Sequence, residues 1–583
     1  MIVTTDSSKN ELIVSIINNI VIIPQSFLYE GSRIVEIKTI HHLEKQAMKK
    51  SHNELARIGF ALFFLVGILA YSFATSGGVP NHLFLAIAAV FGGYMAMNIG
   101  ANDVANNVGP AVGSKALTMS GAIIIAVIFE AGGAFIAGGD VVSTIKNGII
   151  DINGFGGDTE SFLWAMMAAL LAAALWLNIA TMAKAPVSTT HAIVGGVMGA
   201  GVAAAGFGIV NWSTMIKIAS SWVISPLIGG VIAAAFLMSI KKTIVFREDK
   251  ISASYIWVPY YVAFMAWAFV TYLVLKGLKT IWSDILTLIN NIMFFTIEVT
   301  DKPSFAIAGL LGAITAVIVY GVVKRSIKAK LGHLKNDRAS VNLLFTIPLI
   351  FAAALLSFAH GANDVANAIG PLAAINDAVM SGGIRTTAGI PFWVMGVGAF
   401  GIAIGLALYG PRLIKTVGSE ITELDQMRAF SVAMAAAVTV IIASQLGLPV
   451  SSTHIAIGGV FGVGFLREWL DSSTSIEAEI QHDKNELEED KKRRDALKHE
   501  LKDLRKKAIK STEDYRRITE LYEAVDAEKD AIKLVKKEIK KDQKTLYVKR
   551  DAIKKIVTAW VITVPASAVL AASVFYMIKG LMS

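Results

Sequence analysis

Long apolar segments recur along most of the chain. A membrane-spanning helix needs about 20 largely apolar residues, and eleven segments come close to that length. They lie at residues 57–74, 82–99, 119–139, 161–183, 214–240, 255–278, 304–323, 342–359, 390–410, 429–446 and 556–580. The stretch at 279–299 is a further candidate. This pattern predicts an all-α integral membrane protein.

Two other apolar pieces, 186–208 and 449–466, have a different character. Both are rich in glycine and small residues, and both open with polar hydroxyl side chains. Broken helices are tolerated at membrane depth where they are buried in protein or line a cavity, so we predict broken or re-entrant segments here. Residues 1–52 form an N-terminal extension. Its short apolar run, 12–23, lacks a small-residue cleavage site, which favours an interfacial helix over a signal peptide.

Two motifs occur twice in the same order. Gly-Ala-Asn-Asp-Val-Ala-Asn at 100–106 recurs at 361–367, and Pro-Val-Ser-Thr-Thr-His at 186–191 recurs as Pro-Val-Ser-Ser-Thr-His at 449–454. The offsets are 261 and 263 residues, so the chain contains a duplicated unit. We expect the following organisation: extension 1–52, first transport repeat 53–250, connecting spans and a basic loop 251–340, second repeat 341–469, insert 470–555 and last transmembrane helix 556–583.

Basic residues suggest how the two copies are oriented. Lys and Arg gather in cytoplasmic loops beside spanning helices, and here they gather before residue 57, within 324–338 and at 549–555. The loop 75–81 carries no charge, so the 82–99 span should run inward, whereas the 342–359 span should run outward from its basic loop. Inverted repeats with broken helices are typical of secondary transporters. The expected fold is therefore an inverted-repeat secondary transporter.

The insert at 470–555 has its own pattern. Two apolar heptad tracks run through it, separated by Ser511-Thr-Glu-Asp514, which is a helix-start cap. Both ends of the insert join membrane segments, so an antiparallel coiled-coil hairpin is predicted, and the basic residues after it place it in the cytoplasm. The first track holds Ile476, Ile480, Leu487, Leu497, Leu501, Leu504 and Ala508, and the second holds Ile518, Leu521, Val525, Ile532, Val535, Ile539 and Leu546.

Composition separates an apolar body from this insert. Between 471 and 555, 45 of 85 residues are charged, which leaves 54 charged residues among the other 498. The mean hydropathy of +0.58 excludes a soluble enzyme and a disordered chain. The net charge of +9 lies in the loops and is no nucleic-acid signal, and the chain has no cysteine for disulfide or thiolate chemistry. No nucleophile–base set or nucleotide loop is present, so an enzyme is not expected.

The first motif places carboxylates and amides inside apolar segments. A carboxylate at the bilayer centre costs at least ~2.5–3.5 kcal/mol, so it is retained for a partner. Carboxylate and amide oxygens suit a hard cation such as Na⁺, while a carboxylate alone could take up a proton. The glycines, together with Pro110 or Pro371 that follow the two copies, should break the helix and free backbone carbonyls. Polar contacts between helices are the competing interpretation. The candidate cation ligands are Asn102, Asp103, Asn106, Asn363, Asp364 and Asn367.

The second motif supplies three consecutive hydroxyls at the start of a glycine-rich helix. Hydroxyls and free N–H groups at a helix N-terminus make an anion site, and two such termini meeting would surround a tetrahedral oxyanion with donors. An ordinary helix cap followed by small-residue packing is the alternative. The candidate anion ligands are Ser188, Thr189, Thr190, Ser451, Ser452 and Thr453.

Three further residues have open roles. His191 and His454 follow the hydroxyls and could contact a proton or phosphate, or serve only in capping and packing. Glu130 is a lone acid inside a predicted span, and an unpaired membrane carboxylate is a functional candidate. Glu130 could serve a cation, a proton or a lysine, and its rough counterpart in the second half is Gly401.

The two duplicated motifs closely resemble those of the inorganic phosphate transporter (PiT) family. The resemblance covers about 57–466 and the last span. It implies an inverted-repeat symporter in the plasma or inner membrane that moves phosphate with Na⁺ or H⁺, with phosphate among the hydroxyl residues and cations near the Asn-Asp motifs. Asn107 is matched by Ala368, so the two cation environments need not be equivalent. The N-terminal extension and the hairpin are not part of the family core.

The first hypothesis is therefore a cation-coupled phosphate symporter that works by alternating access. It needs no cofactor beyond the coupling ion, Na⁺ or H⁺, and its partners are phosphate, that cation and the bilayer. A sulfate transporter of the same fold is an alternative. A second alternative is a membrane scaffold or sensor that signals through the hairpin, where 470–555 would bind a cytoplasmic partner or a second copy of the chain.

Overall fold

The computed structural model describes residues 32–583 except 184–186, 280, 293–297, 385–388, 421–423, 471–473, 508–510, 546–549 and 583. In these ranges the chain is helical without a strand, and one isolated bridge joins Ile150 to Val210. The chain divides into two compact units, 1–64 and 65–583. The apolar run at 12–23 lies outside the described residues.

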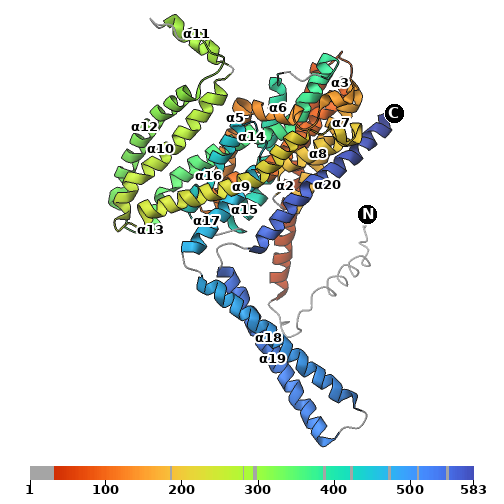
Figure 1. The fold of residues 1–583 in the computed structure, drawn as a ribbon, viewed down its shortest axis with the longest axis vertical. Helices are drawn as coiled ribbons and strands as arrows, with labels where there is room; N and C mark the ends of the chain where they lie inside the picture. Colours follow the sequence, from red (N-terminus) through yellow and green to blue (C-terminus); the bar gives the residue numbers. More distant parts are fainter. Residues whose placement is uncertain are drawn as a thin grey trace, which may run out of the picture. The chain divides into compact units, whose positions relative to one another are not determined.

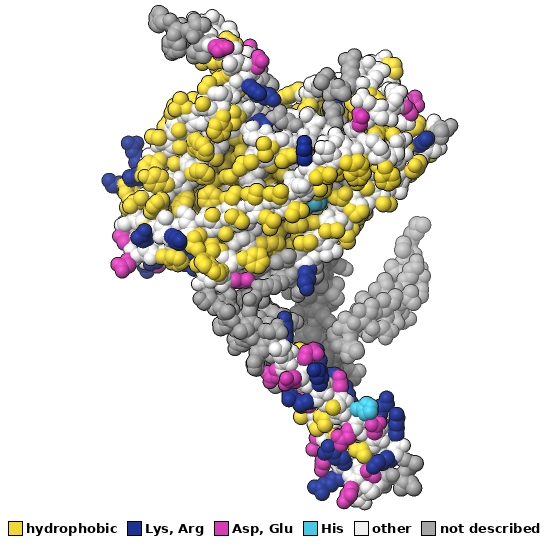
Figure 2. Space-filling view, viewed as in Figure 1, with side chains coloured by type: hydrophobic (Ala, Val, Ile, Leu, Met, Phe, Trp, Pro, Cys, Tyr) yellow, Lys and Arg dark blue, Asp and Glu magenta, His cyan; other side chains and the backbone are white. Residues whose placement is uncertain are grey.

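Eleven of the described helices are long and apolar enough to cross a membrane. They are α2 (Ser32–Thr75), α3 (His82–Asn102) continued by α4 (Val104–Gly113), α5 (Met119–Ala137), α7 (Thr159–Met182), α9 (Trp212–Ile240), α10 (Lys250–Gly277), α12 (Phe305–Lys330), α14 (Thr346–Ser381), α15 (Phe392–Glu420), α16 (Gln426–Gln445) and α20 (Arg550–Met582) (Figure 1). Each overlaps most of one of the eleven segments expected from the sequence. The prediction of an all-α membrane protein is confirmed. Figure 2 shows apolar side chains over most of the visible face of the helical body.

Two expected boundaries differ from the structure. The candidate span at 279–299 contains α11 (Trp282–Ile292), whose 11 residues reach only about 16 Å at 1.5 Å per residue. Among the described residues, this stretch therefore holds no spanning helix. At the other end of the chain, the helical part of the N-terminal extension continues without interruption into the first span, because α2 begins at Ser32.

The two predicted broken segments form α8 (Thr189–Ala205) and α17 (Ser452–Leu470). Both helices begin inside the protein, since Thr189, Thr190, Ser452 and Thr453 are buried. Helix N-termini leave backbone N–H groups without helical partners. The two rows of hydroxyls thus lie beside these backbone N–H groups in the interior of the protein.

The packing of these two helices follows the duplication. A Cβ on Gly199 of α8 would lie 2.2 Å from the carbonyl oxygen of Ala568 in α20, and a Cβ on Gly462 of α17 would lie 2.0 Å from that of Gly230 in α9. Gly199 and Gly462 are counterparts, so Ala568 and Gly230 are counterparts as well. Each half therefore packs its last helix against the re-entrant helix of the other half, and the charged insert interrupts the second half between α17 and α20.

The insert contains α18 (Thr474–Lys506) and α19 (Thr512–Thr545). Ion pairs link Arg493 to Glu528 at 3.4 Å and Arg517 to Glu500 at 2.9 Å, so the helices pack antiparallel. Leu501, Leu521 and Ile532 of the two apolar tracks are buried. The expected cap is also present, because Asp514 N donates to Ser511 Oγ at 3.1 Å and Ser511 N donates to Asp514 Oδ2 at 2.9 Å. A coiled coil that binds a partner stays a prediction.

Candidate functional site

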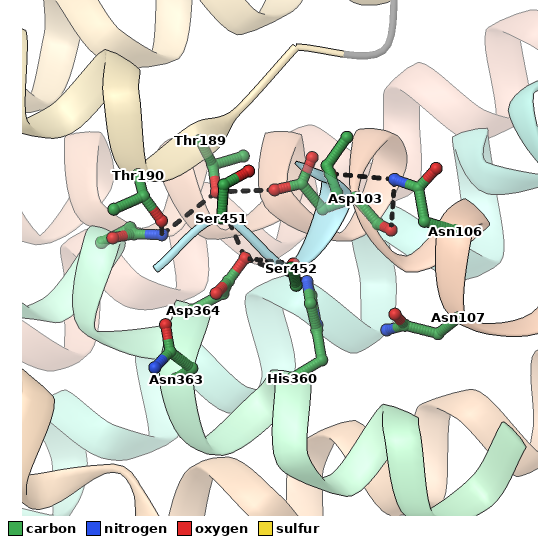
Figure 3. A network of polar contacts seen from close by, with 12 residues as sticks. Asp103, Asn106, Asn107, Thr189, Thr190, His360, Asn363, Asp364, Ser451 and Ser452 are labelled. Atoms are coloured by element: carbon green, nitrogen blue, oxygen red, sulfur yellow. Dashed lines mark hydrogen bonds and ion pairs between the residues drawn. The ribbon is translucent and has the colours of Figure 1, made fainter. Parts of the chain in front are cut away.

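The two Asn-Asp motifs and the two hydroxyl rows meet in one buried network, as Figure 3 shows. Asp103 lies at a break between α3 and α4, whereas Asp364 lies within the uninterrupted helix α14. The expected helix break is therefore present in the first copy, although it falls at Asp103 and Pro110 lies inside α4, and the expectation is wrong for the second copy. Pro371 is accommodated inside α14; a proline there removes the hydrogen bond to the carbonyl four residues earlier, but the remaining contacts keep the helix continuous.

Each aspartate accepts a hydrogen bond from the middle hydroxyl of the re-entrant helix in its own half. Thr189 Oγ1 donates to Asp103 Oδ2 at 2.7 Å, and Ser452 Oγ donates to Asp364 Oδ2 at 3.1 Å. Thr189 Oγ1 also lies 3.5 Å from Asp364 Oδ2. The two carboxylates thus share one group of hydroxyls, and the duplication seen in the sequence is repeated in the contacts.

The asparagines of the two motifs form crossed contacts between the halves. Asn106 Nδ2 donates to Thr453 Oγ1 at 2.9 Å, and Asn367 Nδ2 donates to Thr190 Oγ1 at 3.1 Å. Asn367 Nδ2 is equally close to Thr189 Oγ1. The third hydroxyl of each row therefore binds an amide from the other half.

The first asparagine of each motif points elsewhere. Asn102 Nδ2 donates to Thr181 Oγ1 at 2.9 Å, and Asn363 Nδ2 donates to Ser444 Oγ at 3.0 Å. Thr181 and Ser444 lie near the ends of α7 and α16, just before the segments that lead to the re-entrant helices. Asn102 and Asn363, two of the six predicted cation ligands, therefore bind side chains of the neighbouring helices α7 and α16, and their contacts are separate from the crossed contacts.

Four oxygens of the crossed network lack a hydrogen-bond donor among the described residues. They are Oδ1 of Asp103, Asn106, Asp364 and Asn367, and all four are buried. An unsatisfied buried polar atom costs about 1–3 kcal/mol. Ligand atoms of Asp103, His360 and Asp364 also lie within 4.8 Å of one another. Such a concentration of acceptors suits a hard cation.

The first hydroxyl of each row is a helix cap. Ser188 Oγ accepts from the backbone N–H of His191 at 3.1 Å, and Ser451 Oγ accepts from that of His454 at 3.2 Å. Capping, the alternative expected from the sequence, thus applies to Ser188 and Ser451. Thr190 Oγ1 donates to the carbonyl of Val450 at 3.0 Å, so the starts of the two re-entrant helices are in contact.

The imidazole rings of His191 and His454 meet edge to face, with centroids 4.4 Å apart and an interplanar angle of 89°. His191 lies 3.8 Å from the Trp222 ring, and His454 is stacked at 3.6 Å on the Trp560 ring. Both histidines therefore pack between aromatic rings of α9 and α20, which agrees with the packing alternative.

Glu130 has a partner that the sequence interpretation missed. His360 Nδ1 lies 2.7 Å from Glu130 Oε2, and its Nε2 lies 3.0 Å from Asp364 Oδ2. Asn107 Nδ2 donates to the other oxygen of Glu130 at 2.7 Å. His360 could have been found from its position four residues before Asp364, because residues at this spacing share a helix face.

The positions of the second half that correspond to Glu130 and Asn107 carry no polar side chain. A Cβ on Gly361 would meet the Glu130 carbonyl at 2.2 Å, and a Cβ on the equivalent Gly100 would meet that of Ile402 at 1.9 Å. The counterpart of Glu130 is therefore Ile402, and the assignment to Gly401 was wrong by one residue. Since Ala368 replaces Asn107 and Ile402 replaces Glu130, both polar groups of the pair are absent from the second half.

The buried charges in this region do not balance. Asp103, Glu130 and Asp364 supply three carboxylates, and His360 is the basic group that bridges two of them. Even a charged imidazole would leave at least two negative charges if all three acids are ionised. Buried charges need compensation by a partner or a proton, so this region favours positively charged ligands.

Comparisons with known proteins identify the family of this chain. The model of the phosphate transporter family matches residues 99–571. A Helicobacter pylori protein, named "Putative phosphate permease", is 49% identical over 554 residues, which cover 93% of this chain and 98% of its own. A Pyrococcus horikoshii protein with the same description is 36% identical and covers 67% of this chain and 90% of its own. A solved structure titled "The sodium-dependent phosphate transporter" is similar, with a TM-score of 0.65, 30% identity, and coverage of 85% of this chain and 99% of its own.

Proposed function

Because the chain belongs to the phosphate transporter family, we propose that it carries inorganic phosphate across the membrane together with Na⁺ or H⁺, by alternating access. The chain is a multi-pass plasma-membrane protein whose described residues hold eleven candidate spans, and its family and fold point to a transporter and not to an enzyme. The observation that carries the proposal is the matched contact of Asp103 and Asp364 with hydroxyls at the starts of two helices.

The cation binds at the oxygens of the two Asn-Asp motifs. Oδ1 atoms of Asp103, Asn106, Asp364 and Asn367 are buried acceptors without donors among the described residues, and a hard cation would satisfy them. Asn102 and Asn363 hold the motifs in place through Thr181 and Ser444. Glu130 and His360 adjoin Asp364 and form a second place where positive charge, as a proton or a cation, would be held.

Phosphate binds at the starts of α8 and α17. Helix N-termini and hydroxyls donate hydrogen bonds to anions, and Thr189, Thr190 and Ser452 line this place in Figure 3. Thr453 joins them through its contact with Asn106. Ser188 and Ser451 keep the two termini in shape as caps. Phosphate is the proposed substrate, and sulfate has the same tetrahedral shape, so the experiment below must include it.

Two hydroxyls connect the cation and anion sites. Thr189 and Ser452 each donate to a carboxylate, and a hydroxyl has one proton to donate. A cation on Oδ1 draws negative charge away from the whole carboxylate, which weakens the bond of the hydroxyl to Oδ2 and frees its proton for phosphate. Occupation of one site thereby improves the other, which is the thermodynamic requirement for coupled binding.

The matched packing of the two halves supports alternating access. α8 packs on α20 and α17 packs on α9, and the starts of α8 and α17 meet at one site. We propose that the halves are inverted relative to each other, as the basic loops suggest, and that the membrane face to which the site opens changes during transport.

The test is uptake of labelled phosphate into proteoliposomes with imposed Na⁺ and H⁺ gradients. The name of the similar solved structure makes Na⁺ the first cation to test. We expect one of the two gradients to drive uptake, and an excess of sulfate to leave it unchanged. Uptake indifferent to both gradients would exclude coupling, and full competition by sulfate would exclude phosphate selectivity.

The matched variants are three Asp→Asn substitutions. Asp103→Asn and Asp364→Asn should each abolish gradient-driven uptake, because a neutral amide cannot balance a bound cation. Asp158→Asn is the control, since Asp158 is an exposed cap of α7, and asparagine caps helices as well as aspartate does. Full activity in either site variant would remove that aspartate from the mechanism.

A further inference from the structure

We propose that the short helix α6 (Gly139–Asn147) is a lid over the outer side of the transport site, held shut by an ion pair between Lys146 and Asp377. The inference rests on the proposed function, because a lid matters only if a substrate passes beneath it. Its evidence comes from residues that do not belong to the site described above.

The ion pair joins α6 to the end of α14. Lys146 Nζ contacts Asp377 Oδ2, and the side chains are only 4% and 7% exposed. Taking two charges out of water is costly, so a buried ion pair contributes little net stability compared with an apolar pair of the same size. Lysine and aspartate are also well solvated when separated. A buried pair of this kind is therefore suited to a contact that forms and breaks.

Two more contacts place α6 over the second half of the site. Thr144 Oγ1 donates to the carbonyl of Gly447 at 2.7 Å, within the segment that leads to Ser451 and α17. Ile145 packs against Gly370, where an added Cβ would lie 2.7 Å from its Cγ2. The helix α6 thus touches both α14, which carries Asp364, and the segment before the re-entrant helix.

The position along α14 fits a lid rather than a ligand. Asp377 is 13 residues beyond Asp364, or about 20 Å at 1.5 Å per residue. α14 follows the basic segment 324–338, and such segments are cytoplasmic. The Lys146–Asp377 pair therefore lies toward the outer face.

The chain around α6 is interrupted, and its counterpart is not. α5 ends at Ala137, and α6 begins at Gly139 after a break at Gly138. From the match of Glu130 with Ile402, the equivalent of Gly138 is Gly410, which lies inside the continuous helix α15. A hinged lid is therefore present in the first half alone, so the outer and inner faces would open by different movements.

Thiol labelling tests the lid directly, because the chain contains no cysteine of its own. The reporter is Ala374→Cys, a site that is 3% exposed and lies on α14 between Gly370 and Asp377. The protein is labelled from outside with a membrane-impermeant methanethiosulfonate reagent. The background variants are Lys146→Met, Asp377→Asn and the exchanged pair Lys146→Asp with Asp377→Lys.

We expect Lys146→Met and Asp377→Asn each to raise the labelling rate about tenfold or more, and the exchanged pair to return it toward the parent value. The matched control is Arg338→Met, which removes an exposed ion pair with Asp425 and should not change the rate. Unchanged labelling in both single variants would overturn the lid, and so would an equal increase with Arg338→Met.

A second measurement covers the case in which Ala374→Cys disturbs packing. Lys146→Cys with Asp377→Cys is bridged by a short bifunctional methanethiosulfonate reagent, and uptake is followed before bridging, after bridging and after reduction. Bridging should stop phosphate uptake and reduction should restore it, whereas each single cysteine should be indifferent to the reagent. Uptake that persists at the unbridged rate would refute the lid.

The two proposals can fail separately. Labelling rates are read without transport, so faster labelling in a protein that moves no phosphate would keep the lid and refute the proposed function. Normal coupled uptake with unchanged labelling would support the proposed function and refute the lid.

Discussion

The hydroxyl of Thr189 gives the sharpest test of how the cation and anion sites are coupled. Thr189→Val keeps the size and β-branched shape of the side chain and removes the hydroxyl. In the structure that hydroxyl donates to Asp103 Oδ2 at 2.7 Å and accepts from Asn367. Asn367 keeps Thr190 as an acceptor, so the substitution chiefly removes the donor to the carboxylate and, in the proposed mechanism, to phosphate.

The size of the effect follows from this geometry. A hydrogen bond to a charged group contributes about 1.5–3 kcal/mol, which corresponds to about a 10- to 150-fold change in an equilibrium constant. At saturating cation, the released hydroxyl would donate to phosphate, so the apparent phosphate affinity should fall by that factor. Cation binding without phosphate should not weaken, because the competing donor on Asp103 is gone.

Two concentration series measure these effects: phosphate uptake at saturating cation, and cation binding by calorimetry in the absence of phosphate. Thr439→Val is the matched control, since Thr439 is buried and donates to the carbonyl of Ala435 in its own helix. An unchanged phosphate dependence in Thr189→Val, or an equal loss of phosphate and cation affinity, would refute the shared hydroxyl.

Three further predictions concern packing and the insert. Gly361→Ala should lower the free energy of unfolding in detergent by about 1–3 kcal/mol, because its Cβ would lie 2.2 Å from the Glu130 carbonyl. Gly309→Ala is the control, since its Cβ would have no atom within 4 Å. Equal melting temperatures of the two variants would contradict this packing. Hydrogen bonds from Lys507 and the Ser511 backbone lower the pKa of Asp514 to about 2, so its stabilisation of α19 is complete above the ordinary aspartate pKa and is lost as the pH falls through about 2. Hydrogen exchange of α19 should therefore be faster in Asp514→Ala than in the parent at neutral pH, and the difference should shrink toward pH 2; a difference independent of pH would argue against the ionised cap. Replacing 471–549 by a six-residue linker, the length of the 206–211 connection in the first half, should leave uptake intact, and loss of uptake in a folded variant would assign the insert a role in transport.

The parts of the molecule that depend on local pattern could be predicted well. Eleven spans followed from hydropathy, and the Asp103 and Asp364 motifs followed from repetition, because a membrane requires both long apolar helices and a reason for each buried charge. The helix start at Ser511 also followed from a cap that is local in sequence.

Contacts between distant residues were beyond the same approach. His360 and Glu130 are 230 residues apart, and Lys146 and Asp377 are 231 apart, with no repeat to mark either pair. The continuity of α14 was also missed, because the effect of Pro371 on a helix depends on the neighbours that hold the helix together. The repeated motifs identified the site residues that the two halves share. They gave no information on residues that occur in one half only, such as Glu130 and His360.

The exchange of last helices between the halves has a consequence for the order of synthesis. Gly199 of α8 packs against Ala568 of α20, so the first half contains a helix whose partner is made 369 residues later. At roughly 5–20 residues per second, the delay is about 20–70 s. Once α9 has also been made, the N-terminal half has all its own helices but still lacks α20, so α8 cannot complete its native packing until the ribosome has almost finished the chain. Truncation near the C-terminus should consequently damage the N-terminal half first.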